Sequence, residues 1–380
     1  MSKKKPHILH LQSSFSPGGK ELRTVQLINA FGSKLEHTIV SAVPEQLGAA
    51  ERLKKTAKVT LQPDFFPSLQ GKPTPGRLQK IAAAMQDYDL LLTYNWGSMD
   101  GVMAHTLFGE FYGLPKLIHH EDGFDEAEVT KRMLKRTWFR RIALGKASGL
   151  VVPSEVLEGI ALTEWAQPIG RVKRIANGID TARFAAKPKP DSLPRLMKRP
   201  GEFWVGTLAG LRVVKNLPKL VRAFEPLQAN WHLVIFGDGP AREAILDEAD
   251  RLEINDRVHL PGAIDDPAKV VGLLDIFALS SDSEQFPISV VEAMAAGLPV
   301  AARNVGDIAD MISDENEAFL RPFFAEDDLE GMLVSLAVDE KLRGEIGKAN
   351  QAKARAKFDQ KPMIDTYRRL YSSAMAHDGF

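Results

Sequence analysis

The chain has 380 residues, more than one growing hydrophobic core usually accommodates, so two domains are expected. It contains no cysteine, which excludes a disulfide framework, a thiolate nucleophile and a cysteine metal site. The formal net charge is zero, and the small surplus of Lys and Arg in the first half is too weak to indicate a nucleic-acid partner. No apolar signal segment or spanning stretch of roughly 20 residues is present, so we expect a cytoplasmic protein.

Short apolar runs alternate with segments of helical period along the whole chain, and this pattern predicts parallel strands joined by helices. In the first half the predicted strands are 7–12, 37–43, 89–95 and 116–120, with helices at 21–31, 75–85 and 98–110. In the second half the strands are 203–208, 232–236, 258–260, 276–279 and 299–302, with helices at 216–224, 241–251 and 289–296. Two further helices are predicted at 341–358 and 361–376.

Four prolines between Ala185 and Pro200 interrupt this alternation, because proline fits neither a helix interior nor a central strand. The predicted organisation is therefore a Rossmann-like domain at 1–184, a linker at 185–200 and a second Rossmann-like domain at 201–360. The helix at 361–380 is expected to pack back on the first domain. The fold class is α/β with two doubly wound domains facing across a cleft, and ligands should bind at the carboxyl ends of the strands.

The sharpest motif runs from Ser280 to Val300, where a strand leads into a helix. Pro287 suits the first helical turn, because its missing N–H is not needed there. The free N–H groups of such a helix start favour an anion, and Glu284 and Glu292 are left to accept hydrogen bonds from sugar and ribose hydroxyls. A lone glutamate would be interpreted as solvated, whereas the whole constellation favours a site.

This segment resembles glycosyltransferase family 4, retaining enzymes of the two-Rossmann GT-B class, through its Glu-x7-Glu spacing and its Glu-Ala-Met-Ala-Ala-Gly-Leu-Pro-Val sequence. Gln285 stands where the family often has Gly, and Gly306-Asp307 replaces the commoner Gly-Gly. The resemblance implies a nucleoside-diphosphate-sugar donor, a hydroxyl acceptor, retention of configuration, and neither a metal nor a cofactor. The donor-binding residues that it implies are Gly18, Gly19, Arg212, Lys215, Gly237, Glu284, Phe286, Pro287, Ile288 and Glu292.

A second block, from Val205 to Leu217, resembles the family's strand-to-helix loop that neutralises the leaving diphosphate, and Lys215 falls on the family's Lys. The family's Arg is Gly210 here, so a second cation would have to come from Arg212. Cations placed in advance stabilise charge that builds on the phosphate in the transition state. A lysine in a first helical turn also opposes the helix dipole, which favours a functional role for Lys215.

In the first domain, Gly18 and Gly19 lie between a strand and a helix, as in the family's Gly-Gly-x-Glu, although a plain tight turn explains them equally well. The resemblance assigns the sugar-contacting histidine to His120, which completes a catalytic set with Lys215 and Glu284. The register leaves neighbouring residues open, and the next strand end offers acceptor contacts that aromatic packing explains equally well. These acceptor-side candidates are His119, Asp122, Tyr94, Asn95 and Trp96.

Seven cations lie between Lys131 and Lys146, interleaved at helical spacing with apolar residues that include Trp138 and Phe139. Such a helix is expected to contact an anionic membrane peripherally. An ordinary amphipathic helix with a solvated basic face is the alternative.

The sequence thus predicts a glycosyltransferase that acts on a glycan or lipid-linked acceptor in polysaccharide or lipid-linked glycan synthesis. Two alternatives stay open. One is a nucleotide-sugar 2-epimerase of the same fold, and the other is an inactive donor-binding subunit of a transferase complex, which the Gly at position 210 would permit.

Overall fold

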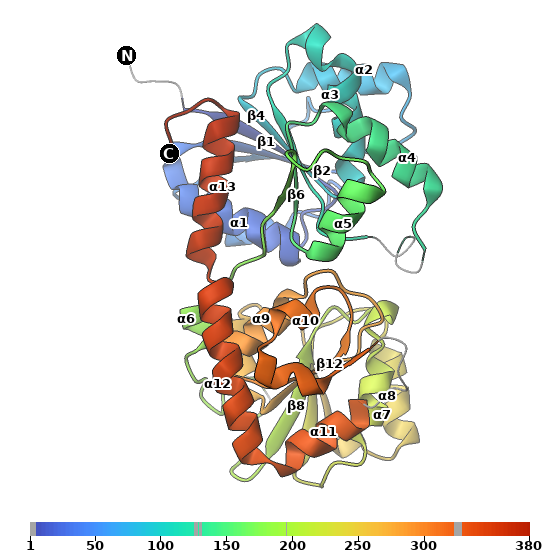
Figure 1. The fold of residues 1–380 in the computed structure, drawn as a ribbon, viewed down its shortest axis with the longest axis vertical. Helices are drawn as coiled ribbons and strands as arrows, with labels where there is room; N and C mark the ends of the chain where they lie inside the picture. Colours follow the sequence, from blue (N-terminus) through green and yellow to red (C-terminus); the bar gives the residue numbers. More distant parts are fainter. Residues whose placement is uncertain (1–4, 125–127, 129–130, 195, 323–328) are drawn as a thin grey trace. The chain divides into compact units, whose positions relative to one another are not determined.

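The computed structural model describes residues 5–124, 128, 131–194, 196–322 and 329–380. The chain forms two compact units, one of residues 1–177 and 361–380 and the other of residues 178–360 (Figure 1). The first unit thus contains most of the last helix, while the predicted linker at 185–200 lies inside the second unit.

The first unit is built on a parallel sheet that has seven strands within the described residues, in the order β3-β2-β1-β4-β5-β6-β7. The strand order reverses between β1 and β4: β2 and β3 follow on one side of β1, and β4 to β7 on the other. Open α/β sheets bind ligands outside the carboxyl ends of the strands at such a point. Its strands are β1 (His7–Gln12), β2 (Glu36–Ser41), β3 (Lys58–Leu61), β4 (Leu90–Tyr94), β5 (Leu117–His120), β6 (Gly149–Val152) and β7 (Val172–Arg174).

Helices cover the sheet of the first unit, and the strands β4, β5 and β6 are buried along their whole length. This burial agrees with their continuous apolar sequences, which are typical of parallel strands covered on both faces. The helices are α1 (Gly19–Phe31), α2 (Pro75–Ala84), α3 (Met99–Tyr112), α4 (Leu134–Ala143), α5 (Glu155–Thr163) and α13 (Gln360–Ala374). The helix in the predicted basic segment from Lys131 to Lys146 is the ten-residue α4.

The second unit repeats the same topology, with a six-stranded parallel sheet in the part of the chain described, in the order β10-β9-β8-β11-β12-β13. Here the reversal lies between β8 and β11. The strands are β8 (Phe203–Leu208), β9 (Trp231–Phe236), β10 (Val258–Gly262), β11 (Ile276–Leu279), β12 (Val300–Asn304) and β13 (Leu320–Pro322). The helices are α6 (Thr181–Phe184), α7 (Leu217–Phe224), α8 (Arg242–Arg251), α9 (Ile288–Ala295), α10 (Ile308–Met311), α11 (Leu329–Val338) and α12 (Glu340–Lys357).

The predicted fold class, two Rossmann-like α/β domains, is confirmed. Most predicted elements agree with the structure to within two residues at each end, whereas the strands β3, β6, β7 and β13 were not predicted. Lys58–Leu61 is largely exposed and alternates polar with apolar residues, so it lacks the continuous apolar run that marks the central strands. Among the described residues, no helix combines the length and the apolar character needed to cross a bilayer.

Histidine and tyrosine side chains fill one part of the interior of the first unit. His10 lies 3.0 Å from the hydroxyl of Tyr94 through Nδ1 and 3.0 Å from Nδ1 of His37 through Nε2. The ring of Tyr94 stacks on that of His120, with 4.7 Å between centroids, and Nε2 of His120 lies 3.0 Å from the hydroxyl of Tyr371. This last contact joins β5 to α13, across 251 residues of sequence.

Burial keeps these histidines neutral. It lowers the pKa of His10 and of His120 well below the usual value of 6.5, with neighbouring His37 and Arg23 respectively adding to the effect. It lowers the pKa of His37 to about 3. Charging any of these rings would place a cation in the interior, which is costly without a counterion.

We therefore expect the free energy of unfolding to fall as the pH drops below about 6.5, because the unfolded chain binds protons that the folded chain excludes. Each excluded proton costs about 1.4 kcal/mol per pH unit, and for His37 the loss continues to about pH 3. Urea unfolding at several pH values measures this pH dependence of the free energy of unfolding. His37→Gln should weaken the pH dependence, while His377→Gln, at an exposed site, should not. Equal pH dependence in the two variants would contradict this explanation.

Candidate functional site

In the second unit, Lys215 and Glu284 meet at the point where the strand order reverses. Lys215 ends the short 3₁₀ turn Val213–Lys215 after β8, and Glu284 lies on the loop between β11 and α9. The Lys215 ammonium pairs with Oε1 of Glu284, and only 13% and 10% of the two side chains are exposed. The hydroxyl of Ser281 donates to the same carboxylate oxygen at 2.7 Å. The structure thus brings together two residues that the sequence assigned to one site.

Hydrogen bonds hold the two loops together around this pair. The hydroxyl of Ser280 donates to the carbonyl of Lys215 at 2.9 Å, and the N–H of Asp282 donates to the carbonyl of Val214 at 2.9 Å. The side-chain amide of Asn216 donates to Asp282 at 3.2 Å. Asn216 adopts a left-handed conformation, with φ 46°, which asparagine tolerates better than most residues. Lys215 is therefore positioned by its backbone, before any ligand binds.

Two glycines allow neighbouring loops to approach this site closely. A Cβ at Gly237 would lie 1.8 Å from the carbonyl oxygen of Ala209, and one at Gly306 would lie 2.5 Å from that of Glu284. Both have positive φ, 140° and 60°. Gly237, predicted to bind the donor, thus supports the loop that follows β8, and Gly306 supports the loop that carries Glu284.

There is space for a side chain at Gly210, the position at which the family has an Arg. A Cβ at Gly210 would meet only Nε of Arg212, at 3.9 Å, and the backbone of Gly210 does not need a positive φ. The exposed side chain of Arg212 therefore lies beside the place where an Arg at position 210 would begin.

The helix α9 begins after Pro287, as the sequence predicted, and its first residue is Ile288. Phe286 packs edge-to-face on Phe358, with 5.6 Å between the ring centroids. Glu292, in the second turn, is half-buried and has no hydrogen bond or ion pair with the residues described. Burial raises its pKa to about 8. A neutral, unpaired carboxyl group next to this site is suited to hydrogen bonds with ligand hydroxyls.

The sequence analysis missed two charged residues of this region, Asp282 and Arg303. Arg303 lies near the end of β12, is 8% exposed and forms an ion pair with Asp282. Burial, and then the charge of Arg303, lowers the pKa of Lys219 in the first turn of α7. The available signal was an arginine at the end of an otherwise small and apolar strand, Val-Ala-Ala-Arg-Asn.

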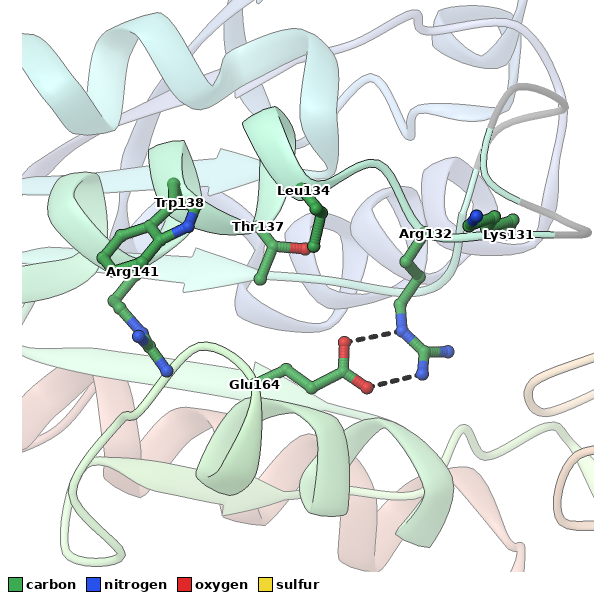
Figure 2. A pocket seen from close by; sticks show the side chains of 7 residues that line it. All are labelled: Lys131, Arg132, Leu134, Thr137, Trp138, Arg141 and Glu164. Atoms are coloured by element: carbon green, nitrogen blue, oxygen red, sulfur yellow. Dashed lines mark hydrogen bonds and ion pairs between the residues drawn. The ribbon is translucent and has the colours of Figure 1, made fainter.

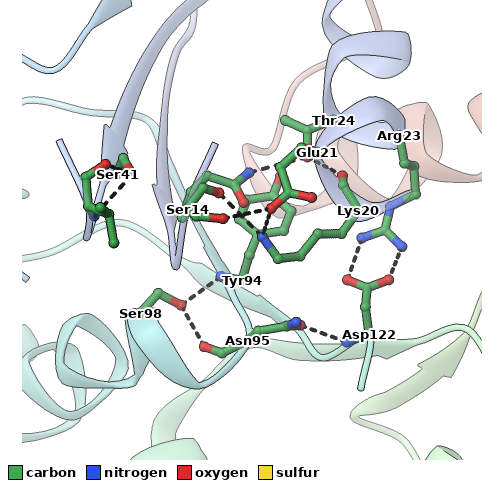
Figure 3. A network of polar contacts seen from close by, with 12 residues as sticks. Ser14, Lys20, Glu21, Arg23, Thr24, Ser41, Tyr94, Asn95, Ser98 and Asp122 are labelled. Carbon is green, nitrogen blue, oxygen red and sulfur yellow. Dashed lines mark hydrogen bonds and ion pairs between the residues drawn. The ribbon is translucent and has the colours of Figure 1, made fainter. Parts of the chain in front are cut away.

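In the first unit, Glu21 organises the start of α1 (Figure 3). Its carboxylate accepts from the hydroxyl of Ser14 at 3.2 Å and pairs with Lys20. A Cβ at Gly18 would lie 2.7 Å from the other carboxylate oxygen, so Gly18 makes room for Glu21, and Gly19 begins the helix. The Gly18-Gly19 segment therefore forms the start of α1, and the Glu21 carboxylate packs against it.

Asp122 is held by Arg23 rather than left free. The Arg23 guanidinium donates to both carboxylate oxygens, the longer bond at 2.9 Å (Figure 3). It also donates to the side-chain oxygen of Asn177 at 2.9 Å. The side-chain oxygen of Asn95 accepts the backbone N–H of Asp122 at 2.8 Å. The carboxyl ends of β4 and β5 are thus linked to α1, and Arg23 is another residue that the sequence analysis did not identify.

The remaining predicted residues of the first unit are in the interior or in aromatic packing. His119 is fully buried and lies 2.8 Å from the hydroxyl of Thr93. His120 and Tyr94 are 1% exposed, so contact between His120 and a sugar requires its hydrogen bond to Tyr371 to be exchanged. Trp96 packs against Phe139 and lies beneath the guanidinium groups of α4. Their roles stay predictions. Among the described residues, no group of three or more His, Asp or Glu side chains is placed to hold a metal.

Most of the second unit is similar to known proteins. Residues 190–353 match the family model of glycosyl transferases group 1. N-acetyl-alpha-D-glucosaminyl L-malate synthase of Bacillus anthracis is 27% identical over 173 residues, 45% of each chain. D-inositol 3-phosphate glycosyltransferase of Segniliparus rotundus is 26% identical over 245 residues, 61% of this chain and 54% of its own. The chain spans about half the length of the curated relatives it matches.

The fold as a whole matches solved structures. HepE of Anabaena, in a complex with UDP, aligns with a TM-score of 0.77 and 20% identity, over 97% of this chain and 100% of its own. A sucrose-phosphate synthase of Thermosynechococcus elongatus aligns with a TM-score of 0.75 and 19% identity, over 97% of this chain and 99% of its own. At these identities the likeness establishes the fold.

The raised pKa of Glu292 predicts that the free energy of unfolding falls as the pH rises from about 4.5 through about 8. In this range the unfolded chain releases a proton that the folded chain retains, at about 1.4 kcal/mol per pKa unit. Thermal unfolding should show Glu292→Gln losing less stability than the wild type between neutral and mildly alkaline pH. The exposed Glu243→Gln serves as the matched control. A wild-type profile in Glu292→Gln would refute a neutral Glu292.

Proposed function

We propose that the chain transfers a sugar from a nucleoside diphosphate to a hydroxyl group, with retention of configuration and without a metal ion. The observation that carries this proposal is the ion pair of Lys215 and Glu284 at the reversal point of the second sheet. It places a cation and a hydrogen-bond acceptor where open α/β sheets bind nucleotides. The match of residues 190–353 to glycosyl transferases group 1 supports the same assignment.

In the proposed reaction, the bond between the anomeric carbon and the phosphate oxygen breaks while the acceptor oxygen bonds to the same face of the sugar. The acceptor proton passes to the leaving phosphate oxygen, which balances the step. Lys215 stabilises the negative charge that develops on the diphosphate. Because the phosphate competes for Lys215, donor binding releases Glu284, whose carboxylate then accepts hydrogen bonds from the sugar hydroxyls.

The remaining donor contacts follow from their places around this pair. Glu292 contacts the ribose, and α9 presents its first N–H groups after Phe286 and Pro287. Arg212 supplies a second cation from beside Gly210. In the first unit, the acceptor contacts Asn95, Trp96 and Asp122 at the carboxyl ends of β4 and β5.

The acceptor is proposed to be a glycan or a lipid-linked molecule. One relative, alpha-monoglucosyldiacylglycerol synthase of Streptococcus pneumoniae, is 27% identical over 51% of this chain, and its name describes a glycolipid product. A nucleoside diphosphate donor agrees with the UDP and UDP-glucose complexes of HepE.

Lys215→Ala and Glu292→Ala should each lower turnover by about a hundredfold or more while the protein stays folded, as expected when a contact to the transferring group is lost. Arg212→Ala should have a smaller effect, because its side chain is exposed. Lys269→Ala, an exposed side chain at the end of a 3₁₀ turn of the same unit, is the control. Turnover is measured as nucleoside diphosphate release with an added acceptor.

If Lys215→Ala or Glu292→Ala retained wild-type turnover, the residue replaced would not belong to the site. The products of the wild-type reaction separate the alternative functions. Free epimerised sugar formed without an acceptor would identify a 2-epimerase, and a donor that is bound but never cleaved would identify a binding subunit.

The open position at Gly210 allows a test by gain of function. Gly210→Arg should tighten nucleoside diphosphate binding by roughly tenfold, because a cation in addition to Lys215 and Arg212 then faces the phosphates, in a position that needs no positive φ. Gly210→Ala, which adds no charge, should leave the affinity unchanged. Thermal shifts with UDP, GDP and ADP measure the binding. No gain with any of the three would contradict a diphosphate site at this loop.

A further inference from the structure

The basic segment around α4 has an inner and an outer set of cations. Arg140 belongs to the inner set, because it is 1% exposed and donates to Glu121 at 3.2 Å and to Glu128 at 3.0 Å. Its guanidinium also lies over the rings of Trp96 and Trp165, at 4.9 and 5.2 Å. Arg140 therefore anchors α4 to the unit and cannot reach a surface, so not all seven cations of the predicted basic segment are available to a membrane.

Three further cations are neutralised by acidic partners. Arg132 forms two hydrogen bonds with Glu164, the longer at 2.6 Å (Figure 2). Arg136 pairs with Glu128 at 3.2 Å, and Lys146 pairs with Glu110 at 2.6 Å.

The outer set consists of Lys131, Lys135 and Arg141. Within the described part of the chain, no ion pair involves any of the three, and both lysines are exposed. Arg141 lies over the ring of Trp138, 4.9 Å from its centroid. Positive charge therefore remains on the outer side of α4 once the ion pairs of the other cations are taken into account.

The same side of α4 exposes large apolar side chains at every fourth position. Leu134 is 76% exposed, Trp138 is 58% exposed and Ile142 is 55% exposed. Leu134, Trp138 and Arg141 also line a hollow of about 480 Å³ (Figure 2). An exposed apolar stripe of this kind is unusual on a monomer and indicates a binding surface.

The neighbouring helix α3 also exposes large apolar side chains. Leu107 and Phe111, again four residues apart, are 55% and 77% exposed. The hydroxyl of Thr106 donates to the carbonyl of Ala143 at 2.5 Å, which ties α3 to the end of α4, and Figure 1 shows the two helices side by side.

We propose that this outer face, made by the outer cations with Leu134, Trp138, Ile142, Leu107 and Phe111, docks on an anionic lipid bilayer. A helix with a tryptophan among aliphatic side chains and flanking cations fits the interface between headgroups and acyl chains. A second copy of the chain fits less well, because a two-fold contact would bring the same unpaired cations against each other. The bilayer supplies the negative charge that the face lacks.

The test is co-sedimentation of the whole chain with phosphatidylcholine vesicles, with and without phosphatidylglycerol, at low and at high salt. We expect binding to the anionic vesicles alone, weakened by salt. Replacing Lys131, Lys135 and Arg141 by Ser should weaken binding by about fivefold for each cation. Leu134→Ser with Trp138→Ser should weaken it at least as strongly. Arg140 is left unchanged because it is buried.

Two matched controls separate this face from general effects. Lys55, Lys72 and Lys173, exposed elsewhere on the first unit, are replaced by Ser together, and Phe65 and Ile169 are replaced by Ser as the apolar control. Both controls should bind like the wild type. The proposal is overturned if the wild type ignores anionic vesicles at low salt, or if the controls lose as much binding as the face variants. It is also overturned if a dimer forms that Trp138→Ser abolishes. The assay contains neither donor nor acceptor, so its result is independent of sugar transfer.

Discussion

Lys215 and Glu284 meet because β8 and β11 are neighbours in a parallel sheet, although 69 residues separate the two side chains. The reversal of strand order leaves a gap beside the carboxyl ends of these strands, and the loops that follow them turn into it. Hydrogen bonds from Ser280 and Asp282 join the loop after β11 to the loop after β8. Gly237 and Gly306 allow neighbouring backbone to pack closely against these loops. The charged pair is therefore preorganised, and in the proposed function a diphosphate replaces the Glu284 carboxylate at Lys215.

The sequence predicted the parts of the fold in which local chemistry and tertiary packing agree. Continuous apolar runs marked β1 and β8 within their observed bounds, and Pro287 marked the start of α9. The edge strand β3 was missed, because an exposed edge needs no continuous apolar run. The interior position of Arg140 was also missed, since its partners Glu121 and Glu128 lie on a loop whose path only the tertiary structure determines.

The difference between local sequence patterns and tertiary contacts also applies to the candidate site. The sequence could single out Lys215, Glu284 and Glu292 as candidates because their motifs lie within single strand-to-helix segments. The ion pair of Arg303 with Asp282, and the contact of His120 with Tyr371, join segments that no local pattern relates. For His120 the consequence is substantial, because a residue predicted to face a sugar lies in a buried network that includes the last helix. A polar side chain at a strand end is thus evidence for a site, whereas its accessibility depends on the rest of the fold.

The central claim is that Lys215 exchanges the Glu284 carboxylate for a diphosphate. The most direct measurement is a crystal structure of the protein with whichever of UDP, GDP or ADP gives the largest thermal shift. The account predicts that the terminal phosphate contacts the Lys215 ammonium, that Glu284 has turned away from it, and that the ribose lies against Glu292. A nucleotide bound elsewhere, with the ion pair of Lys215 and Glu284 intact, would contradict it.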